Sequence, residues 1–456
     1  MQTNAAAVAS RRDAASEDPV EQASVGRISL SDRLLALSVA ALPLQKAFTV
    51  DVGFPLKPTE ILLIFAVATG ILRAPAGYWR GPRIPRGIYF AVVGLGVTVV
   101  LATAWAYTGD IPPGPYSGFT RSVTADLVSY LFYGLLVIAA WIRLAKLPWK
   151  LFQRMFVVSI YVAAAGCLLQ YILFKSNNLA AMRQFGFELV VGGAYGAPVP
   201  RNGTFFEGNY LGFYAVVALF VAVRSGRKLP VAAALACLAY SQSTGAVVGL
   251  AAGIAASAIF MANARWRFRI MVTALVTVAG LLMVAPARGF MLYQIQKLGG
   301  GSAQNADVTA SADVRSTKAD IAFRMIEHHP VVGVGPGRFG VWFQQYIGDA
   351  QLPVSYFTGK SRFIVENAYL QVGAELGLLG LAFLALVLWF SFRQATTVDP
   401  LTVAIVAAVA VMLNATPSWT TLTIWYSLAF VAALAFQKAA PRAPWHQGIF
   451  VARTSD

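Results

Sequence analysis

Charged and hydrogen-bonding side chains gather in the segment 200–212, directly before an apolar run. The segment contains Arg201, Glu207 and Asn209. Free backbone amides at the start of a helix and the fork of a guanidinium group both bind phosphate groups. The pattern therefore indicates an anion-binding site at a helix N-terminus. The alternative is an arginine that extends to the membrane surface next to a helix cap.

A second set of cations lies between residues 313 and 328, where apolar residues recur with helical spacing. Arg315, Lys318 and, less directly, Arg324 fall along one side of this predicted helix, at spacings of three and six residues. They indicate either a cationic wall over a site for phosphate groups or an ordinary solvated face. Pro330 ends the helix. Three glycines that allow tight turns follow it: Gly333, Gly335 and Gly337.

Carboxylates mark the start of the apolar run 368–392. Glu366 and Asn367 precede the run, and Glu375 lies roughly 14 Å further along a helix that rises about 1.5 Å per residue. Ionisable groups inside a membrane segment are rare and indicate function by default. The alternatives are a carboxylate that stabilises a helix N-terminus, for Glu366, and a buried packing residue, for Glu375. Two further acids are interpreted mainly as structural: Glu60 and Asp126.

Neither a metal site nor a disulfide framework is expected. His328 and His329 are adjacent, so only one of them can face a given site, and no cysteine or carboxylate lies nearby at metal-ligand spacing. Cys167 and Cys237 both lie in apolar runs.

Composition identifies the class of protein that must position these groups. Of the 456 residues, 57% are hydrophobic and 12% are charged. Soluble domains have roughly 45–50% apolar and about 25% charged residues. A soluble, disordered or fibrous chain is therefore excluded. Since about 20 apolar residues form one membrane span, we predict an all-α polytopic membrane protein with about twelve spans: 33–49, 58–73, 88–107, 122–142, 155–174, 208–223, 230–245, 246–262, 270–288, 368–392, 401–416 and 420–437.

The positions of Lys and Arg predict the orientation. They concentrate in four loops on one side, around 73–86, 143–154, 224–228 and 265–269, and are fewer in the opposite short loops. Cation-rich short loops face the cytoplasm, so both termini are predicted to be cytoplasmic. The formal net charge of +16 is then mainly a topology signal, and nucleic acid is not an expected partner.

The long loop between the ninth and tenth spans is the largest predicted feature outside the membrane. The predicted organisation is a disordered tail, nine transmembrane helices, a cap loop, three further helices and a second tail: 1–28, 29–288, 289–367, 368–437 and 438–456. The first part of the cap loop, 299–312, is rich in small polar residues and is expected to be mobile.

Three motifs occur together in this frame: Arg201 with Gly-Thr-Phe before the sixth span, the segment 315–337 in the large loop, and Glu366-Asn-Ala-Tyr-Leu with Glu375-Leu-Gly-Leu-Leu-Gly. In this combination the sequence resembles the O-antigen ligase and Wzy-type polymerase family of bacterial membrane proteins. The motifs cover about 150–395, and the topology covers nearly the whole chain. Two Arg-x10-Gly spacings are also similar to motifs of the polymerases: Arg201 to Gly212 and Arg324 to Gly335.

The resemblance implies a GT-C-like glycosyltransferase of the bacterial inner membrane, with its active site facing the periplasm. The donor would be a glycan on undecaprenyl diphosphate, and transfer would invert the sugar without a metal or another cofactor. The acceptor would be a second lipid-linked repeat unit in a polymerase, or lipid A–core in a ligase. The other expected partners are the lipid bilayer and, for a polymerase, a chain-length regulator.

The resemblance also implies roles for individual residues. Arg201 and Arg315 would hold the diphosphate, and the adjoining cations are Lys318 and Arg324. The usual base of the family is a His directly before an Asn on the tenth span, where this sequence has Glu366. A carboxylate can accept the proton of a hydroxyl nucleophile, so Glu366 is the predicted base, and the departure favours a polymerase over a ligase. Four residues are expected to support these groups: Glu207, Asn209, Asn367 and Glu375.

Two classes other than an enzyme stay open. A transporter of lipid-linked oligosaccharides would suit about twelve spans, but transporters commonly contain structural repeats and midplane sites. This sequence shows no repeat, and its ionisable groups gather near one face of the membrane. A purely structural partner in an assembly is the third alternative.

Overall fold

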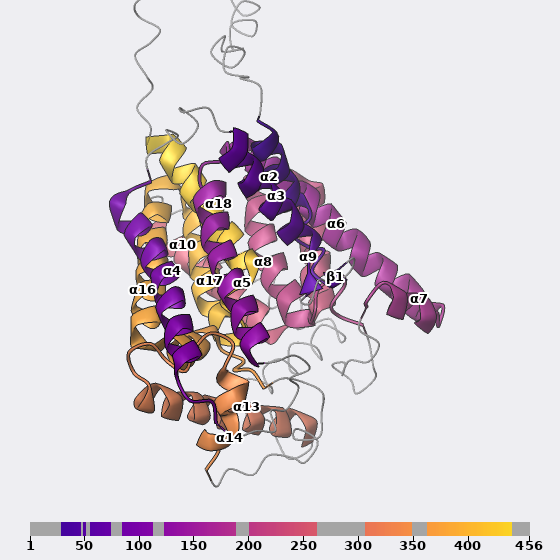
Figure 1. Cartoon of the computed structure of the whole chain (residues 1–456). Coiled ribbons are helices and arrows are strands. Elements are labelled where there is room, and N and C mark those ends of the chain that lie inside the picture. Colours follow the sequence, from indigo (N-terminus) through magenta and orange to yellow (C-terminus); the bar gives the residue numbers. More distant parts are fainter. Residues whose placement is uncertain are drawn as a thin grey trace, which may run out of the picture.

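The computed structural model describes residues 29–46, 49–51, 55–73, 84–112, 123–187, 200–261, 306–348 and 363–439. These residues form a helical membrane protein (Figure 1). Two short strands, β1 (Val50–Asp51) and β2 (Pro55–Leu56), pair antiparallel between the first two helices.

Apolar helices make up most of the described chain: α2 (Leu30–Ala40), α3 (Pro58–Arg73), α4 (Arg86–Thr108), α5 (Val123–Leu144), α6 (Trp149–Lys175), α8 (Gly208–Arg224), α9 (Lys228–Ser241), α10 (Thr244–Phe260), α16 (Ala368–Val398), α17 (Pro400–Met412) and α18 (Leu422–Ala439). Four of them are long and apolar enough to cross a membrane: α4, α5, α6 and α16. The predicted span 270–288 and both predicted tails lie outside the described residues, apart from the end of α18. The number of spans therefore stays a prediction.

The first helix is shorter than the predicted span 33–49. Helix α2 ends at Ala40 and is followed by a turn that contains Pro43. The chain then turns toward the α8 side of the molecule, where the backbone N–H of Lys46 donates to the carbonyl oxygen of Thr204 at 2.9 Å. The apolar residues after Ala40 therefore line a connection rather than extend the helix.

Small residues let neighbouring helices pack closely. Gly94 of α4 lies against the ring of Phe383 in α16, and Gly249 of α10 lies against Met412 of α17. A Cβ atom at either glycine would come closer than 3.0 Å to that neighbour. Close packing through small residues is a principal source of helix association in membranes, where the surrounding lipid is as apolar as the side chains.

Helix α16 is broken near its start. The sequence had predicted a continuous span over 368–392, so this part of the prediction was wrong. Gly377 has φ 69° and ψ −173°, a region that only glycine occupies readily. The segment after α13 fills the break: the N–H of Leu378 donates to the carbonyl oxygen of Pro330 at 2.7 Å, and the N–H of Val334 donates to that of Ala374 at 2.9 Å. These bonds satisfy backbone groups that the break would otherwise leave unpaired.

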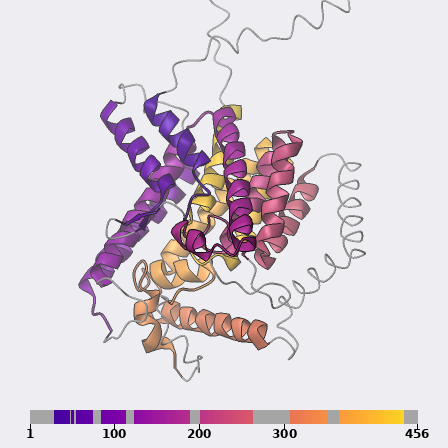
Figure 2. The ribbon, with the colours of Figure 1, turned by 90° about the vertical axis from the view of Figure 1, so that its right-hand side faces the viewer.

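Two helices form the described part of the cap: α13 (Ala306–His328) and α14 (Phe339–Tyr346). The predicted helix over 313–328 is confirmed, although it starts earlier, at Ala306. Its apolar face packs on α14 and on the start of α16 through a separate core that includes Ile321, Met325 and Phe343. Figure 2 shows α13 lying across one end of the helix bundle.

The loops that connect the helices lie at two opposite ends of the bundle. The start of α2 and the end of α18 lie at the end opposite α13 and α14 (Figure 1). At that end, Arg224 pairs with Asp399, and Lys438 donates to the carbonyl oxygen of Val398 at 2.8 Å. The cation-rich loops around 143–154 and 224–228 are at this end, which is the predicted cytoplasmic side. The orientation in the membrane stays a prediction.

Candidate functional site

Glu366 lies between two cations of the cap helix α13. Arg315 donates from Nε to Oε2 of Glu366 at 2.5 Å, and Lys318 donates from Nζ to Oε1 at 3.3 Å. The Lys318 side chain is 7% exposed, whereas that of Arg315 is 55% exposed. The structure therefore brings together the predicted base and two of the predicted phosphate-binding cations, which lie about 50 residues away in the sequence.

Packing fixes both partners of this contact. One face of α13 is buried through Val314, Ile321 and Met325, so Arg315 and Lys318 are held at the edge of the cap core. On the other side, Val365 is buried in the same core. Asn367 caps α16 by accepting the N–H groups of Tyr369 and Leu370. Glu366 thus lies between an anchored residue and a helix cap.

The pKa of Glu366 results from two opposing effects. Burial alone would raise it, because a carboxylate loses hydration when it is enclosed. The charges of Arg315 and Lys318, and the hydrogen bonds from both, outweigh burial and hold the pKa of Glu366 below its ordinary value. Without a ligand, Glu366 is therefore an ionised but weak base.

Glu207 and Arg201 approach the same cluster from the N-terminus of α8. Glu207 is the residue that precedes the helix, and its side chain does not cap it. Burial and the nearby charge of Glu366 raise the pKa of Glu207, and Arg201, Arg315 and Lys318 oppose this increase. These five groups thus interact electrostatically in one cluster of three cations and two carboxylates.

Arg201 is positioned by a close backbone approach. The Cγ and Cδ atoms of Arg201 pack against Gly208. A Cβ atom at position 208 would lie 3.0 Å from both, so a larger residue there would crowd the arginine. The buried Nε of Arg201 has no hydrogen-bond partner among the described residues. A buried guanidinium nitrogen without a partner is unfavourable unless an acceptor arrives. It is therefore a suitable donor for an anionic ligand.

Arg324 is not brought to this cluster. Its Nη1 donates to the carbonyl oxygen of Tyr346 at 3.1 Å, inside the cap. The reason is helical geometry: nine residues at about 100° each place Arg324 roughly half a turn away from Arg315 around α13. The predicted common side holds for Arg315 and Lys318, which are three residues apart.

The remaining predicted residues have structural partners. Asn209 accepts the hydroxyl of Ser243 at 3.0 Å. Glu375 is 2% exposed next to the break in α16, where its carboxylate accepts from the side chain of Gln371 at 3.2 Å and from the N–H of Phe339 at 3.5 Å. The structure therefore favours the packing alternative for Glu375 and gives Asn367 a capping role.

The two adjacent histidines both belong to the cap. His328 lies 2.8 Å from the carbonyl oxygen of Arg324, and Nε2 of His329 lies 2.9 Å from the hydroxyl of Tyr346. Within the part of the chain that the structure describes, no group of three His, Cys, Asp or Glu side chains could hold a metal ion.

Sequence reasoning missed the residues that border the cluster on the bundle side. The hydroxyl of Tyr210 interacts electrostatically with both Glu207 and Glu366, and it is hydrogen-bonded to Thr421. Lys57 lies near the ring of Phe206. Tyr210 lies three residues after Glu207, within the segment 200–212, so the sequence could have indicated it. No sequence pattern around Lys57 or Thr421 indicates a site.

Part of the chain matches a known protein family. Residues 229–385 match the family model described as O-antigen ligase, and no curated protein matches the chain. The matched segment covers about a third of the chain and includes Arg315, Lys318 and Glu366, but neither Arg201 nor Glu207. The match of residues 229–385 confirms the predicted resemblance of this sequence to the O-antigen ligase and Wzy-type family.

Proposed function

We propose that this protein is a membrane glycosyltransferase that transfers a glycan from undecaprenyl diphosphate to a sugar hydroxyl, most closely as a Wzy-type polymerase of repeat units. The observation that carries the proposal is the contact of Glu366 with Arg315 and Lys318, inside the segment that matches the O-antigen ligase family. It combines a proton acceptor with cations for a phosphate leaving group.

The cations suit a diphosphate. Arg201, Arg315 and Lys318 outnumber the two carboxylates of the cluster by one, so the site keeps a positive charge. As the glycosidic bond breaks, negative charge builds on the leaving oxygen. Guanidinium and ammonium groups that are already in place stabilise this charge more in the transition state than in the ground state. The leaving group therefore needs no metal ion for charge neutralisation.

The same cations link donor binding to the strength of the base. A diphosphate competes with Glu366 for Arg315 and Lys318. When the phosphate oxygens take these partners, the effects that lower the pKa of Glu366 weaken, while the effect of burial, which raises it, stays. Glu366 then becomes a stronger base only in the presence of the donor.

The groups of the cluster account for the proton and the leaving group of the transfer step. The acceptor hydroxyl oxygen attacks the anomeric carbon from the face opposite the diphosphate, and its proton goes to Glu366. The bond between the anomeric carbon and the phosphate oxygen breaks, and the electron pair leaves with undecaprenyl diphosphate. The configuration at the anomeric carbon is inverted.

The main alternative within this class is a ligase that uses lipid A–core as acceptor, and the name of the matched family favours it. The glutamate at the position of the usual histidine favours a polymerase. A transporter of lipid-linked oligosaccharides is less well supported. Although the break in α16 is a feature of many transporters, the site cluster lies at the cap end of the bundle.

The proposal is tested with purified protein in nanodiscs and the lipid-linked glycan extracted from the cells that make it. A polymerase yields a ladder of longer lipid-linked glycans without any other acceptor. A ligase yields product only when lipid A–core is added. If neither acceptor receives glycan while the protein is folded and binds the lipid, the glycosyltransferase proposal is wrong, and movement of the lipid across the bilayer is measured next.

A further inference from the structure

A pocket of ≈ 270 Å³ lies beside this cluster, between the α2–α3 connection, α5, the start of α8 and the turn before α18. Eight of its thirteen lining residues carry a hydroxyl group. Pockets for drug-sized ligands have volumes of roughly 300–1,000 Å³, so this one suits a smaller molecule. Because carbon atoms make up most of the surface that this lining exposes, it suits a ligand that has apolar faces as well as hydroxyl groups.

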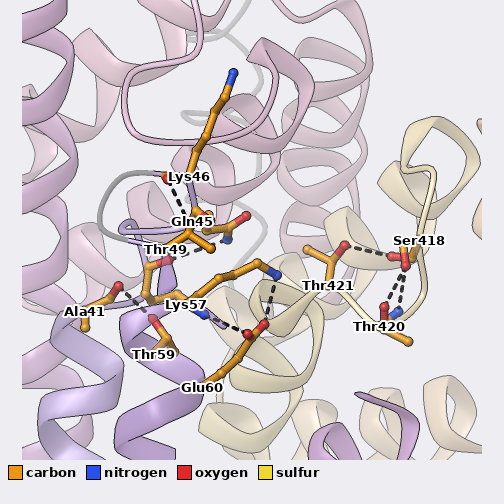
Figure 3. A network of polar contacts seen from close by, with 11 residues as sticks. Ala41, Gln45, Lys46, Thr49, Lys57, Thr59, Glu60, Ser418, Thr420 and Thr421 are labelled. Carbon is orange, nitrogen blue, oxygen red and sulfur yellow. Dashed lines mark hydrogen bonds and ion pairs between the residues drawn. The ribbon is translucent and has the colours of Figure 1, made fainter. Parts of the chain in front are cut away.

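Two threonines in the pocket offer acceptors to a ligand. Thr59 donates its hydroxyl hydrogen to the carbonyl oxygen of Ala41 at 2.7 Å, and Thr421 donates to that of Ser418 at 2.8 Å (Figure 3). A hydroxyl has one hydrogen and two lone pairs, so each oxygen can still accept, and Thr421 keeps one lone pair in addition to its hydrogen bond with Tyr210. The hydroxyl hydrogens of a sugar are matching donors.

Lys57 adds donors without adding net charge to the pocket. Its Nζ lies 2.9 Å from Oε1 of Glu60, and its backbone N–H donates to Oε2 of the same carboxylate at 2.9 Å (Figure 3). Glu60 is 1% exposed, whereas the side chain of Lys57 is 22% exposed, so the carboxylate is shielded and the ammonium group is accessible. The other ammonium hydrogens can bond to neutral oxygen acceptors. This pairing favours an uncharged, hydroxylated ligand over a phosphate group.

Aromatic rings complete a surface suited to a sugar. The Nζ of Lys57 lies 5.6 Å from the ring centroid of Tyr133 and 5.5 Å from that of Phe206, and both rings line the pocket. The negative face of an aromatic ring attracts the weakly positive C–H groups of a sugar ring, as it attracts a cation. Gly337 of the cap packs directly on the ring of Tyr130, another lining residue.

The pocket adjoins the carboxylates of the site. Phe206 and Tyr210 both line it, and Glu207 lies between them in the sequence. The Tyr210 hydroxyl interacts electrostatically with Glu207 and Glu366. We propose that this pocket binds one sugar residue of the glycan substrate and so places that sugar beside the two carboxylates. The inference rests on the proposed function and adds the sugar-binding site to it.

Binding of two probes separates the sugar from the rest of the substrate. The probes are undecaprenyl diphosphate and the lipid-linked glycan extracted from the cells that make the protein, each titrated against the protein in nanodiscs. The variants are Thr421→Val and Tyr133→Leu, with Thr69→Val as the matched control. Like Thr421, Thr69 donates its hydroxyl hydrogen to a nearby backbone carbonyl, that of Phe65 at 2.7 Å, but it lies outside the pocket. Transfer is measured alongside for each variant, both as extension of the lipid-linked glycan and as transfer to lipid A–core.

We expect Thr421→Val and Tyr133→Leu to weaken binding of the lipid-linked glycan about tenfold and to leave binding of undecaprenyl diphosphate unchanged. Thr69→Val should match the wild type with both probes. A loss seen only in transfer to lipid A–core would also support the pocket and assign its sugar to the acceptor.

Equal weakening of the binding of both probes would overturn the inference, because the variants would then affect binding of the lipid or the diphosphate rather than of the sugar. Wild-type binding and transfer in both variants would overturn it too and leave the proposed function intact. Failure of the wild type itself to bind or transfer the lipid-linked glycan would instead refute the proposed function. Thr421→Val is nearly isosteric, so it tests the pocket even if Tyr133→Leu does not fold.

Discussion

Arg315 of the cap helix α13 donates from Nε to Oε2 of Glu366 at 2.5 Å, directly before the first turn of α16. This contact connects the cap to the helix bundle at the residue that we propose as the base. In the proposed mechanism, the base and the leaving group would therefore use the same cation. Opening and closing of the cap would therefore change both binding of the diphosphate and the basicity of Glu366.

Replacing Arg315 by alanine should remove most transfer. The loss of a preplaced cation at the leaving group lowers kcat by roughly 100- to 1,000-fold in comparable sites. The matched control is Arg324→Ala, which removes the same side chain from the same helix but outside the cluster. Arg324→Ala should keep substantial transfer and lower the thermal stability of the cap, since the carbonyl of Tyr346 loses its donor. Equal loss in both variants would contradict the assignment of Arg315.

Glu366→His should keep part of the activity and change its pH dependence. In the wild type, Arg315 and Lys318 keep the pKa of Glu366 low, so the base form persists, and kcat/KM should not fall until the pH is below the ordinary pKa of a glutamate. A histidine titrates near pH 6.5. The acid limb of the variant should therefore lie about two pH units higher.

The wild-type pH profiles also test the competition between the donor and Glu366. The kcat/KM profile reports the free protein and the kcat profile reports the substrate complex. If the bound diphosphate takes the two cations as proposed, the acid limb of kcat should lie at higher pH than that of kcat/KM. Coincident limbs would show that the cations stay on Glu366 during transfer.

Much of the fold follows from the sequence because membrane helices depend on long apolar runs. The predicted spans 88–107 and 208–223 lie within α4 and α8. The break at Gly377 was missed because its cause is not local: the segment after Pro330 supplies the hydrogen bonds that replace those of the helix. A hydropathy profile averages over many residues, so it does not detect a break at one residue.

The site was predictable where it depends on one helix and not where it depends on several. The spacing of three residues placed Arg315 and Lys318 together, and the apolar pattern of 313–328 oriented them. The spacing of nine residues took Arg324 to the other side, which a strict helical projection would have shown. Lys57 belongs to the site through contacts across the bundle, so no local pattern could reveal it.

Gly377→Ala should destabilise the protein strongly. Its backbone conformation is restricted to glycine, and a Cβ would be 2.3 Å from the carbonyl oxygen of Val331. Gly226→Ala is the control, because Gly226 also has a positive φ but no atom within 4 Å. The control should lose only about 1–2 kcal/mol of stability. A melting temperature for Gly377→Ala equal to that of Gly226→Ala would show that the break tolerates a side chain.

Chelators should not inhibit transfer. In the proposed mechanism, guanidinium and ammonium groups neutralise the leaving group, so removal of divalent cations should leave that function in place. Transfer is measured after dialysis against EDTA and again after addition of Mg²⁺ or Mn²⁺. A rate that falls on dialysis and returns with either metal would require a metal-dependent step.

The central claim is that Glu366 accepts the proton of the acceptor during transfer from undecaprenyl diphosphate. The most direct measurement compares wild type and Glu366→Gln in nanodiscs with the lipid-linked glycan, following both product length and release of undecaprenyl diphosphate. Glutamine keeps the size of the side chain but cannot take a proton. We predict that the wild type extends the glycan and releases the lipid diphosphate, and that Glu366→Gln still binds the substrate but does neither. Extension at the wild-type rate by Glu366→Gln would contradict the claim.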